Sequence, residues 1–405
     1  MSVPEGWEKH PIGKICKSIV PGRNKPKSFD GTIPWITTPD IQGRYLPSKA
    51  QRNFISETAI KESGAKIVPA GGVVIAAVGE LGLTAIAAEP IVLNQQLHAF
   101  ICTDNIYNEY LAYWLETQKP YMDSVASKTT IPYMNKSNCE SIPVIFPLLP
   151  EQKKIVRILS TWDRAIEVAE KLLNNSRQQK KALMQQLLTG KKRLPGFNGK
   201  WKKVNIGNVV HIASGKSKSK FINENGERYI IDMGSISREG KLIPSKKTDL
   251  DEDYLLHEQL VMPKDDIGGG NIIGRVGFID QDRKYVLGDH VYALYVHGCD
   301  SLFLCYLINH DTVNKSLRRK ANGTAQLGLG KKDVEKQPVY IPNTKEEQQK
   351  IASVLSAANK EIEILEQKLG CLRQEKKALM QQLLTGKRRV KVDGSEAPEK
   401  EAARA

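Results

Sequence analysis

A long segment of this chain occurs twice. Residues 180–193 read KKALMQQLLTGKKR, and residues 376–389 repeat them with a single change, KKALMQQLLTGKRR. The match extends back to Glu151 and Glu347, with about 25 identities in 43 positions at a constant offset of 196 residues. Such self-similarity is typical of a tandem repeat, in which one structural unit is built twice. The chain is therefore expected to fold as two related units.

The residues ahead of each copy are related more weakly. At offsets near 194 the matching pairs are Trp7 with Trp201, Ile12–Gly13 with Ile206–Gly207, Val92–Leu93 with Val286–Leu287, and Ala99 with Ala293. Their polar positions differ almost completely. The predicted order is a first globular domain (1–150), a first helical spacer (151–193), a second globular domain (194–345), a second helical spacer (346–389) and a disordered tail (390–405).

Both spacers carry apolar residues at alternating spacings of four and three, the pattern of a coiled-coil seam. The predicted seam is Ile155, Leu159, Trp162, Ile166, Leu173, Leu183 and Leu187 in the first spacer, and Ile351, Leu355, Ile362, Leu365, Leu369, Leu372, Leu379 and Leu383 in the second. Pro150 and Pro342 precede the helices, and Gly190 and Gly386 close them.

The spacers could instead be two amphipathic helices that each pack on their own domain. Their length favours the coiled coil, because a helix of roughly 40 residues is about 60 Å long and exceeds one such domain. Facing seams would require antiparallel helices and a pseudo-two-fold axis. The globular halves read as mixed α/β, with short apolar runs and one clear helix each, at 107–117 and 302–309. The expected fold class is thus an α/β (α+β) tandem repeat with two long antiparallel helices.

The charge balance points to a polyanionic partner. Lys and Arg exceed Asp and Glu to give a net charge of +15, which favours nucleic acid or an anionic membrane surface. Membrane is the weaker choice, because residues 1–10 lack the apolar run of a signal peptide and the longest apolar stretch, 67–78, is too short to span a bilayer. A cytoplasmic protein is expected. The six cysteines form no CxxC pair, so neither a zinc site nor a disulfide framework is predicted.

Polar and basic clusters recur at corresponding places in the two halves. Lys and Arg can neutralise phosphates, whereas Arg, Gln, Asn and Asp match hydrogen-bonding groups on base edges. The candidate DNA-binding residues are Arg23, Lys25, Lys27, Thr37, Thr38, Gln42, Arg44, Gln95, Gln96, Lys128, Thr129 and Lys136, and in the second half Lys216, Lys218, Lys220, Ser235, Ser237, Arg238, Arg275, Asp289, His290, Arg319, Lys320, Lys331 and Lys332. Gln95–Gln96 and its counterpart Asp289–His290 are favoured for base reading. Taken singly, each of these residues is better explained as ordinary solvated surface, and it is the recurrence at equivalent positions that favours DNA binding for the set.

The sequence contains no motif for catalysis by this chain. Neither a glycine-rich cofactor loop, a base-holding Asn-Pro-Pro-Tyr-like tetrapeptide nor a nucleotide-binding P-loop occurs. A metal-dependent nuclease remains as a minor alternative, on Asp265 or Asp266 followed by Asp282-Arg283-Lys284. A coiled-coil scaffold that binds nucleic acid without sequence choice is the other.

The ordered motifs resemble the specificity subunits of type I restriction-modification systems. They are the opening Pro4-Glu5-Gly6-Trp7, the junction from Ile142-Pro143 to Glu151-Gln152, its altered copy from Val339 to Glu347-Gln348, and the doubled KKALMQQLLTG. The resemblance covers residues 1 to about 390; Asn343-Thr344-Lys345 departs from the usual second junction.

The resemblance implies two target-recognition domains that each read half of a bipartite, asymmetric site on double-stranded DNA, with helices that set the unread spacer. It implies two modification (methyltransferase) subunits, which bind S-adenosylmethionine, and two restriction (endonuclease and translocase) subunits, which use ATP and Mg²⁺. No cofactor is expected in this chain.

Overall fold

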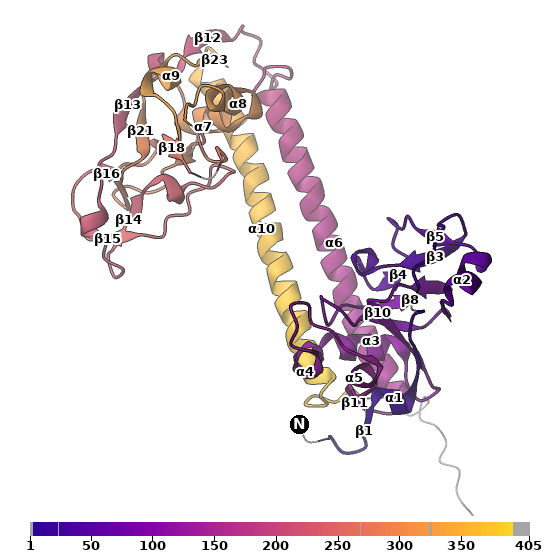
Figure 1. Ribbon diagram of the computed structural model, residues 1–405. Coiled ribbons are helices and arrows are strands. Elements are labelled where there is room, and N and C mark those ends of the chain that lie inside the picture. The colour runs from indigo at the N-terminus through magenta and orange to yellow at the C-terminus, as the bar shows by residue number, and fades with distance from the viewer. Residues whose placement is uncertain (1–2, 23, 268, 324–325, 392–405) are drawn as a thin grey trace, which may run out of the picture. The chain divides into compact units, whose positions relative to one another are not determined.

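The computed structural model describes residues 3–22, 24–267, 269–323 and 326–391 (Figure 1). It divides into two compact units, which we call unit 1 (residues 1–169 with 368–405) and unit 2 (residues 170–367). Most of the predicted tail, 392–405, lies outside the described residues. The boundary between the units falls inside both long helices, so each unit contains a globular domain and a part of each helix.

Unit 1 is built on two mixed sheets. The first has the order β2 (Cys16–Ile19), β10 (Leu97–Cys102), β7 (Val73–Ala76), β8 (Thr84–Ala87), β4 (Tyr45–Leu46), and the second has the order β5 (Phe54–Ile55), β3 (Ile33–Ile36), β9 (Ile91–Leu93), β6 (Ile67–Val68). A third pair joins β1 (Glu8–Pro11) to β11 (Pro143–Phe146). The helices are α1 (Ile12–Ile15), α2 (Glu57–Ser63), α3 (Asn108–Glu116), α4 (Lys119–Val125), α5 (Lys136–Glu140) and the 3₁₀ turn η1 (Thr38–Asp40).

Unit 2 repeats this plan. Its first sheet has the order β13 (Val210–Ser214), β21 (Val291–Val296), β17 (Leu260–Pro263), β19 (Gly277–Phe278). Its second sheet has the order β15 (Lys247–Thr248), β14 (Arg228–Ile231), β20 (Tyr285–Leu287), β16 (Tyr254–Leu255). Two further pairs join β12 (Lys202–Asn205) to β23 (Pro338–Ile341) and β18 (Asp265–Asp266) to β22 (Leu327–Gly328). The helices are α7 (Ser301–Asn309), α8 (Asp311–Arg318), α9 (Lys331–Glu335) and the 3₁₀ turns η2 (Ile206–Asn208), η3 (Ser219–Phe221) and η4 (Met233–Ser235). The predicted tandem of mixed α/β domains is confirmed.

Two features of the sheets matter for function. Central strands such as β7, with all four residues buried, read as continuous apolar runs because both of their faces are covered. Unit 1 has two parallel pairs of neighbouring strands, β3 with β9 and β4 with β8, and unit 2 has the parallel pair β14 with β20. The carboxyl ends of a parallel pair lie at the same edge of a sheet, so the segments that follow these strands are brought together.

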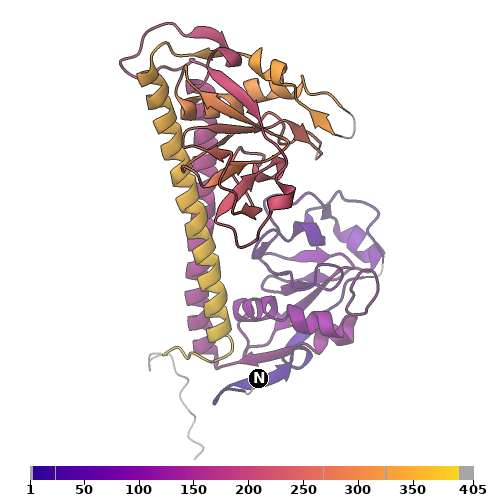
Figure 2. The ribbon, with the colours of Figure 1, turned by 90° about the vertical axis from the view of Figure 1, so that its left-hand side faces the viewer.

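The two long helices are α6 (Leu149–Leu187) and α10 (Lys345–Leu383). Within each unit their parts lie side by side (Figures 1 and 2). Their direction is antiparallel, because Glu151 pairs with Arg389 and Asp163 with Lys376 in unit 1, while Ser176 bonds Glu361 in unit 2. The long antiparallel helices are thus confirmed. All predicted seam side chains are buried or half-buried, and those near the helix ends, such as Ile155 and Leu355, also belong to the cores of the adjoining domains.

An ion pair with a buried carboxylate joins the two long helices at each end, and we call it the junction clasp. In unit 1 the Nε and Nη2 of Arg389 both donate to the Glu151 carboxylate at 2.8 Å, and in unit 2 Arg193 does the same to Glu347 at 2.6 and 2.7 Å. Both carboxylates are almost fully buried. The Arg three residues after each copy of KKALMQQLLTG therefore pairs with the Glu near the start of the other long helix.

The glutamine next to each clasp acid ties the long helix to the domain. Gln152 is fully buried; its side-chain amide donates to the carbonyls of Asn105 and Pro147, and its oxygen accepts from the Tyr107 N–H, each at 2.8 Å. Gln348 bonds the Asp300 N–H and the Pro342 carbonyl in the same way. The Glu-Gln motif of the junction is thus structural in both repeats.

All six cysteines are free. Among the described residues, no helix is long and apolar enough to cross a membrane.

Candidate nucleic-acid interface

Four segments meet at one edge of unit 1, which we call the recognition edge of that unit: the polar residues 37–42, 94–96 and 127–133, and the apolar link 77–79. The first and second segments follow the parallel strands β3 and β9 and are joined by the Asn94 N–H to Ile36 carbonyl bond of 2.9 Å. Ala77 then links the remaining segments, because its N–H donates to Gln96 and its carbonyl accepts from Met134, both at 2.8 Å. The edge is a set of loops fixed to a rigid sheet.

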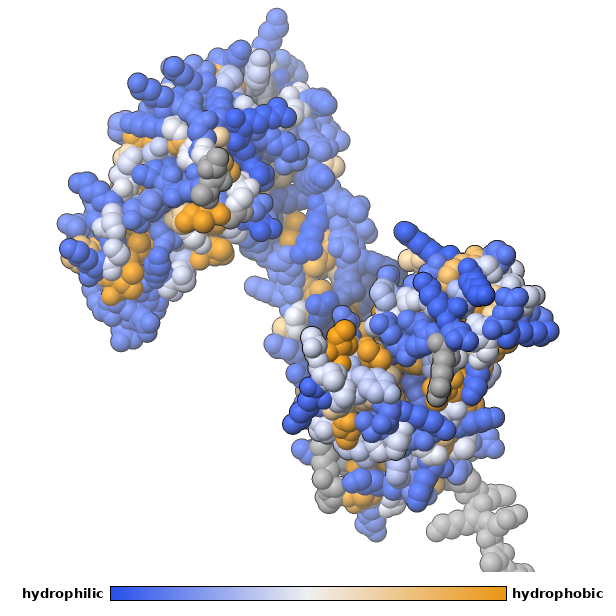
Figure 3. All heavy atoms as spheres, in the orientation of Figure 1, coloured by the Kyte–Doolittle hydropathy of each residue, from blue (hydrophilic) through white to orange (hydrophobic). Residues whose placement is uncertain are grey.

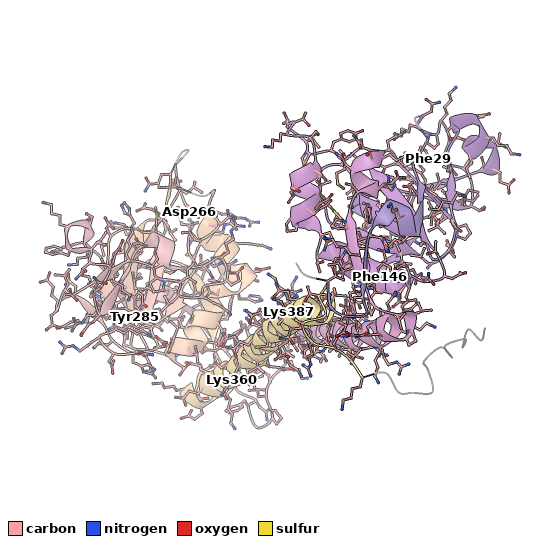
Figure 4. The ribbon with its side chains drawn as sticks, turned by 90° about the horizontal axis from the view of Figure 1, so that it is seen from below. Phe29, Phe146, Asp266, Tyr285, Lys360 and Lys387 are labelled. Carbon is pink, nitrogen blue, oxygen red and sulfur yellow. The ribbon has the colours of Figure 1, made fainter. Side chains whose placement is uncertain are left out.

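Unit 2 builds its recognition edge with the corresponding three backbone bonds. Its segments are 232–238, 264–266, 288–290, and 322–323 with 326–329. Gly288 donates to the Ile231 carbonyl at 2.9 Å, Lys264 donates to His290 at 3.0 Å, and Leu329 donates to Lys264 at 2.7 Å. Figure 4 labels Asp266 on this edge and Tyr285, which begins β20, on the opposite side of the unit. The two edges share a backbone framework and carry different side chains.

The favoured base-reading pairs lie on these edges. Gln95 and Gln96 are exposed, and Gln96 accepts a hydrogen bond from Thr38 at 3.3 Å. Asp289 and His290 are half-exposed; the Nδ1 of His290 lies 2.7 Å from the Asp265 carboxylate. His290 also has a φ of 60°, a left-handed conformation that is rare for a residue with a side chain and persists only where its surroundings enforce it.

Many of the predicted phosphate-binding side chains are exposed, and Figure 3 shows hydrophilic residues over most of the visible face of each unit. The exposed candidates are Lys25, Lys27, Gln42, Lys128, Thr129 and Lys136 in unit 1, and Lys216, Lys220, Arg238, Arg319, Lys331 and Lys332 in unit 2. Lys136 and Lys331 pair with Glu140 and Glu335 one helical turn away, contacts that cost little to break at a surface. Arg23 lies outside the described residues.

Other candidates are occupied by the domains themselves. The ammonium of Lys218 is buried and lies 2.5 Å from Asp253. Ser235 is buried and caps η4 with Asp232, as Thr37 caps η1 with Asp40. The polar groups of these side chains already have internal partners, so they are not available to DNA.

The remaining candidates make internal contacts near the edges or the helices. The Oγ of Ser237 accepts two backbone N–H groups in a turn, and Lys320 donates to the Asp333 carbonyl. Arg44 stacks on Tyr113 and pairs with Glu116 and Asp163, where it joins the domain to α6. Arg275 donates to the Asn309 carbonyl at 2.7 Å.

The sequence reasoning missed some exposed side chains on or beside these edges. Ile131 and Tyr133 are about half exposed in unit 1, and Lys246 in unit 2 pairs with Asp232 at 2.6 Å, which raises its pKa. Ile131 and Tyr133 stand in the same polar stretch as Lys128 and Thr129, but isolated apolar residues gave no signal. The backbone carbonyl of Lys246 accepts a hydrogen bond from Ile230 in the neighbouring strand β14, which brings its side chain to the edge. This pairing between strands cannot be recognised from residue spacing in the sequence.

Burial lowers the pKa of His98 to about 4, and Lys136 contributes in the same direction. His98 lies on β10, two residues after Gln96, with its ring against Phe100 and its Nε2 beside the Ser18 hydroxyl. A buried histidine whose folded pKa is depressed favours the neutral form. Its contribution to stability is therefore complete above pH 6.5 and is lost as the pH falls from 6.5 toward 4.

We expect unit 1 to lose about 2 kcal/mol of stability from this group between pH 8 and pH 5. Denaturant unfolding of the full chain at both pH values should show a smaller acid loss in His98→Gln than in the parent. His211→Gln, which changes an exposed histidine on β13, is the control. An equal acid loss in the parent and in His98→Gln would contradict the assignment.

The minor nuclease alternative finds no support in the geometry. The Asp266 side chain is buried and accepts the Ile272 N–H, and Asp265 faces His290. Asp282 instead accepts the His257 N–H, beside the beginning of β20. The carboxylates thus lie at opposite ends of that strand, and no group of metal-ligating side chains occurs within the described part of the chain.

Comparisons with known proteins agree on one family. The family described as "Type I restriction modification DNA specificity domain" matches residues 4–175 and 198–373. The MjaVIII specificity subunit of Methanocaldococcus jannaschii, a type I restriction enzyme component, is 29% identical over 420 residues, which cover 96% of this chain and 95% of that protein. The MjaIX specificity subunit of the same organism is 30% identical over 176 residues, 42% of this chain and 40% of that one.

Solved structures share the fold at low sequence identity. The S subunit of a type I restriction-modification system from M. genitalium has a TM-score of 0.63 at 14% identity, over 95% of this chain and 98% of that one. A chain from a study of complex assembly and conformational transition of the type I R-M system has a TM-score of 0.59 at 15% identity, over 95% and 99%.

Proposed function

Because this chain belongs to the family of type I restriction-modification DNA specificity subunits and carries two of its specificity domains, we propose that unit 1 and unit 2 each read one half of a bipartite, asymmetric site on double-stranded DNA through their recognition edges. The single observation that carries this proposal is the pair of matched edges. The same three backbone bonds support Gln95–Gln96 in one unit and Asp289–His290 in the other. A shared framework with different hydrogen-bonding groups suits two different half-sites.

The exposed lysines and arginines around the edges supply the sequence-independent part of binding. They would neutralise phosphates and so make the affinity fall as salt rises. A scaffold that binds nucleic acid without sequence choice would need these cations but would have no use for two divergent polar edges. Sequence-specific reading therefore accounts for more of the structure.

The long helices would set the unread spacer and dock two modification subunits. Their related sequences, which match at about 25 of 43 positions, offer similar surfaces to two identical partners. In this proposal S-adenosylmethionine belongs to the modification subunits, ATP and Mg²⁺ belong to two restriction subunits, and the complex acts in the cytoplasm. The clasp acids and Gln152 and Gln348 have structural roles here, so partner docking falls to the exposed faces of α6 and α10.

The test is substitution on one edge at a time. Gln95→Ala should reduce discrimination in one half-site by about 5- to 150-fold, which corresponds to 1–3 kcal/mol for one base contact. His290→Ala should do the same in the other half-site. Methylation mapping with the modification partner, followed by binding to duplexes that vary each half-site, measures both effects.

Gln374→Ala, an exposed glutamine on α10, is the matched control and should change neither half-site. Binding that is equally strong to the mapped site and to random duplex would favour the non-specific scaffold. A change in both half-sites from one substitution would show that the edges do not read independently.

A further inference from the structure

Unit 2 contains a cleft of about 1070 Å³ where its domain meets α6. The cationic side chains that line it are Lys180, Lys181, Lys191, Arg238, Lys241, Arg275, Lys315 and Arg318, whereas Glu239 and Asp311 are its only acidic lining residues in the described part of the chain. Lys241 pairs with Glu363 and Lys315 with Asp311. The other cations have no carboxylate partner among the described residues, which leaves a concave surface with a large excess of positive charge.

The repeat shows what is missing from this cleft. At the corresponding place in unit 1, Lys376 pairs with Asp163 at 2.6 Å, and Arg44 pairs with Glu116 at 2.9 Å. The Tyr113 hydroxyl also donates to Asp163. Two cations and two carboxylates thus neutralise each other inside unit 1.

Unit 2 keeps the cation and the tyrosine but replaces both acids by amides. At the repeat offsets Lys180 stands for Lys376, Tyr306 for Tyr113, Asn359 for Asp163 and Asn309 for Glu116. Asn359 donates to the Tyr306 hydroxyl at 2.8 Å, so the local packing is retained without the charge. The negative charge that balances this lysine in unit 1 is therefore absent from the same place in unit 2.

The groups that remain are poorly neutralised. Burial, followed by the nearby Lys241, lowers the pKa of Lys180. Burial also lowers the pKa of Arg275, although the nearby Asp311 partly opposes it. The Nε of Arg275 is also buried without a hydrogen-bond partner among the described residues. A bound anion would relieve both conditions.

The cleft is continuous with the recognition edge of unit 2. Residues 232–238 of the edge lead directly into Glu239–Lys241 of the lining, and Asp266 accepts the Ile272 N–H at 2.8 Å beside Arg275. Helix α8 contributes Arg318 to the lining and leads into Asn322 of the edge. A strand of nucleic acid held at the edge has a positively charged path into the cleft.

We propose that this cleft binds phosphate groups, and that their source is the sugar-phosphate backbone of the DNA whose half-site unit 2 reads. The inference rests on the proposed DNA-reading function and adds a backbone contact that unit 1 lacks. The spread of cations over three segments of unit 2 and over α6 favours a polyanion over a single small ion. Lys180, Arg275 and Arg318 would contact phosphates, and Asn359 would keep the site free of an internal carboxylate.

The first test installs the missing acid. Asn359→Asp should recreate the lysine-carboxylate pair of unit 1, and Lys180→Gln should remove the cation. Each change should weaken binding to a duplex that carries the mapped site by about 5- to 20-fold at moderate salt, and Lys180→Gln should reduce the slope of log affinity against log salt by about one. The matched control is Lys376→Gln, because that lysine is already neutralised by Asp163 and its loss should leave the affinity unchanged.

The other arms identify the source of the phosphate. A duplex with neutral methylphosphonate linkages beside the unit 2 half-site should bind the parent more weakly than the natural duplex does. On this duplex Lys180→Gln and the parent should have equal affinity, because the phosphate charge that Lys180 contacts has been removed. Saturable binding of ATP that depends on Lys180, with DNA affinity unaffected, would assign the cleft to a free nucleotide and overturn the proposal. The proposal would also be overturned if both variants kept their DNA affinity but bound the modification subunit more weakly. That result would mean that the cleft binds an acidic segment of the partner protein.

The affinity of the parent protein for its mapped site distinguishes failure of the cleft proposal from failure of the DNA-reading function on which it rests. If the parent binds its mapped site specifically and neither variant alters that affinity, the cleft assignment alone is wrong. If the parent shows no preference for the mapped site, the DNA-reading function itself is wrong.

Discussion

Exchanging residues 8–146 for the matching segment of a relative that reads a different site is expected to replace one half of the recognised site and to leave the other half unchanged. All four segments of the unit 1 recognition edge, and the sheets that support them, lie within this range. The preference for the original half-site over the new one should reverse, by about three orders of magnitude or more, because specific and non-specific affinities typically differ by 10³- to 10⁷-fold.

The structure moves the crossover point of this exchange. A boundary at residue 150 would cut inside α6, which begins at Leu149. Ending the exchanged segment at Phe146, the last residue of β11, keeps the clasp acid Glu151 and the anchoring Gln152 in their own helix. Because the hydrogen bonds of Gln152 to the exchanged segment go to backbone groups of Asn105 and Tyr107, a relative with another sequence there can still form those bonds.

Methylation mapping of the hybrid with its modification partner measures the outcome. A second hybrid in which residues 202–341 are exchanged instead is the control and should change the other half-site. Alteration of both half-sites by either hybrid would mean that the two recognition edges are not independent.

Removing one partner of a junction clasp should cause the largest loss of stability among single substitutions proposed here. Arg193→Met leaves the Glu347 carboxylate, whose side chain is 4% exposed, without its bidentate partner. Breaking a buried pair by deleting one member costs about 3–5 kcal/mol. Since a quarter of the Arg193 side chain is exposed, the expected loss is near 3 kcal/mol, and it should appear in the denaturant unfolding of the full chain.

Two further variants make the clasp result specific. Lys192→Met removes the neighbouring exposed lysine, which has no carboxylate partner among the described residues, and should change stability by less than about 0.5 kcal/mol. The double substitution Arg193→Met with Glu347→Met removes both charges and should recover part of the loss. Equal destabilisation by Arg193→Met and Lys192→Met would contradict the role of the clasp.

The sequence by itself determined the tandem repeat, the long helices and the family. Each of these depends on relations along the chain: a constant offset between copies, a spacing of three and four residues, and an order of motifs. Such periodicity can be recognised in the sequence alone, because residues spaced three and four apart lie on the same face of a helix. The doubled KKALMQQLLTG is visible in the sequence, whereas the ion pairs of Arg193 and Arg389, which follow its two copies, are visible only in the structure.

Only the tertiary structure decided which polar residues are available to a ligand. Arg44 and Lys218 are residue types that often bind DNA, yet each is held by a carboxylate from a distant part of its own unit. Conversely, Lys180 stands in the doubled KKALMQQLLTG segment, and the structure places it in the same cleft as Asn359, a residue 179 positions away in the chain. Whether a charged side chain faces solvent, a ligand or an internal carboxylate depends on contacts between segments that are distant in the sequence. Those contacts set its desolvation and ion-pairing energies, which the spacing of residues along the chain does not reveal.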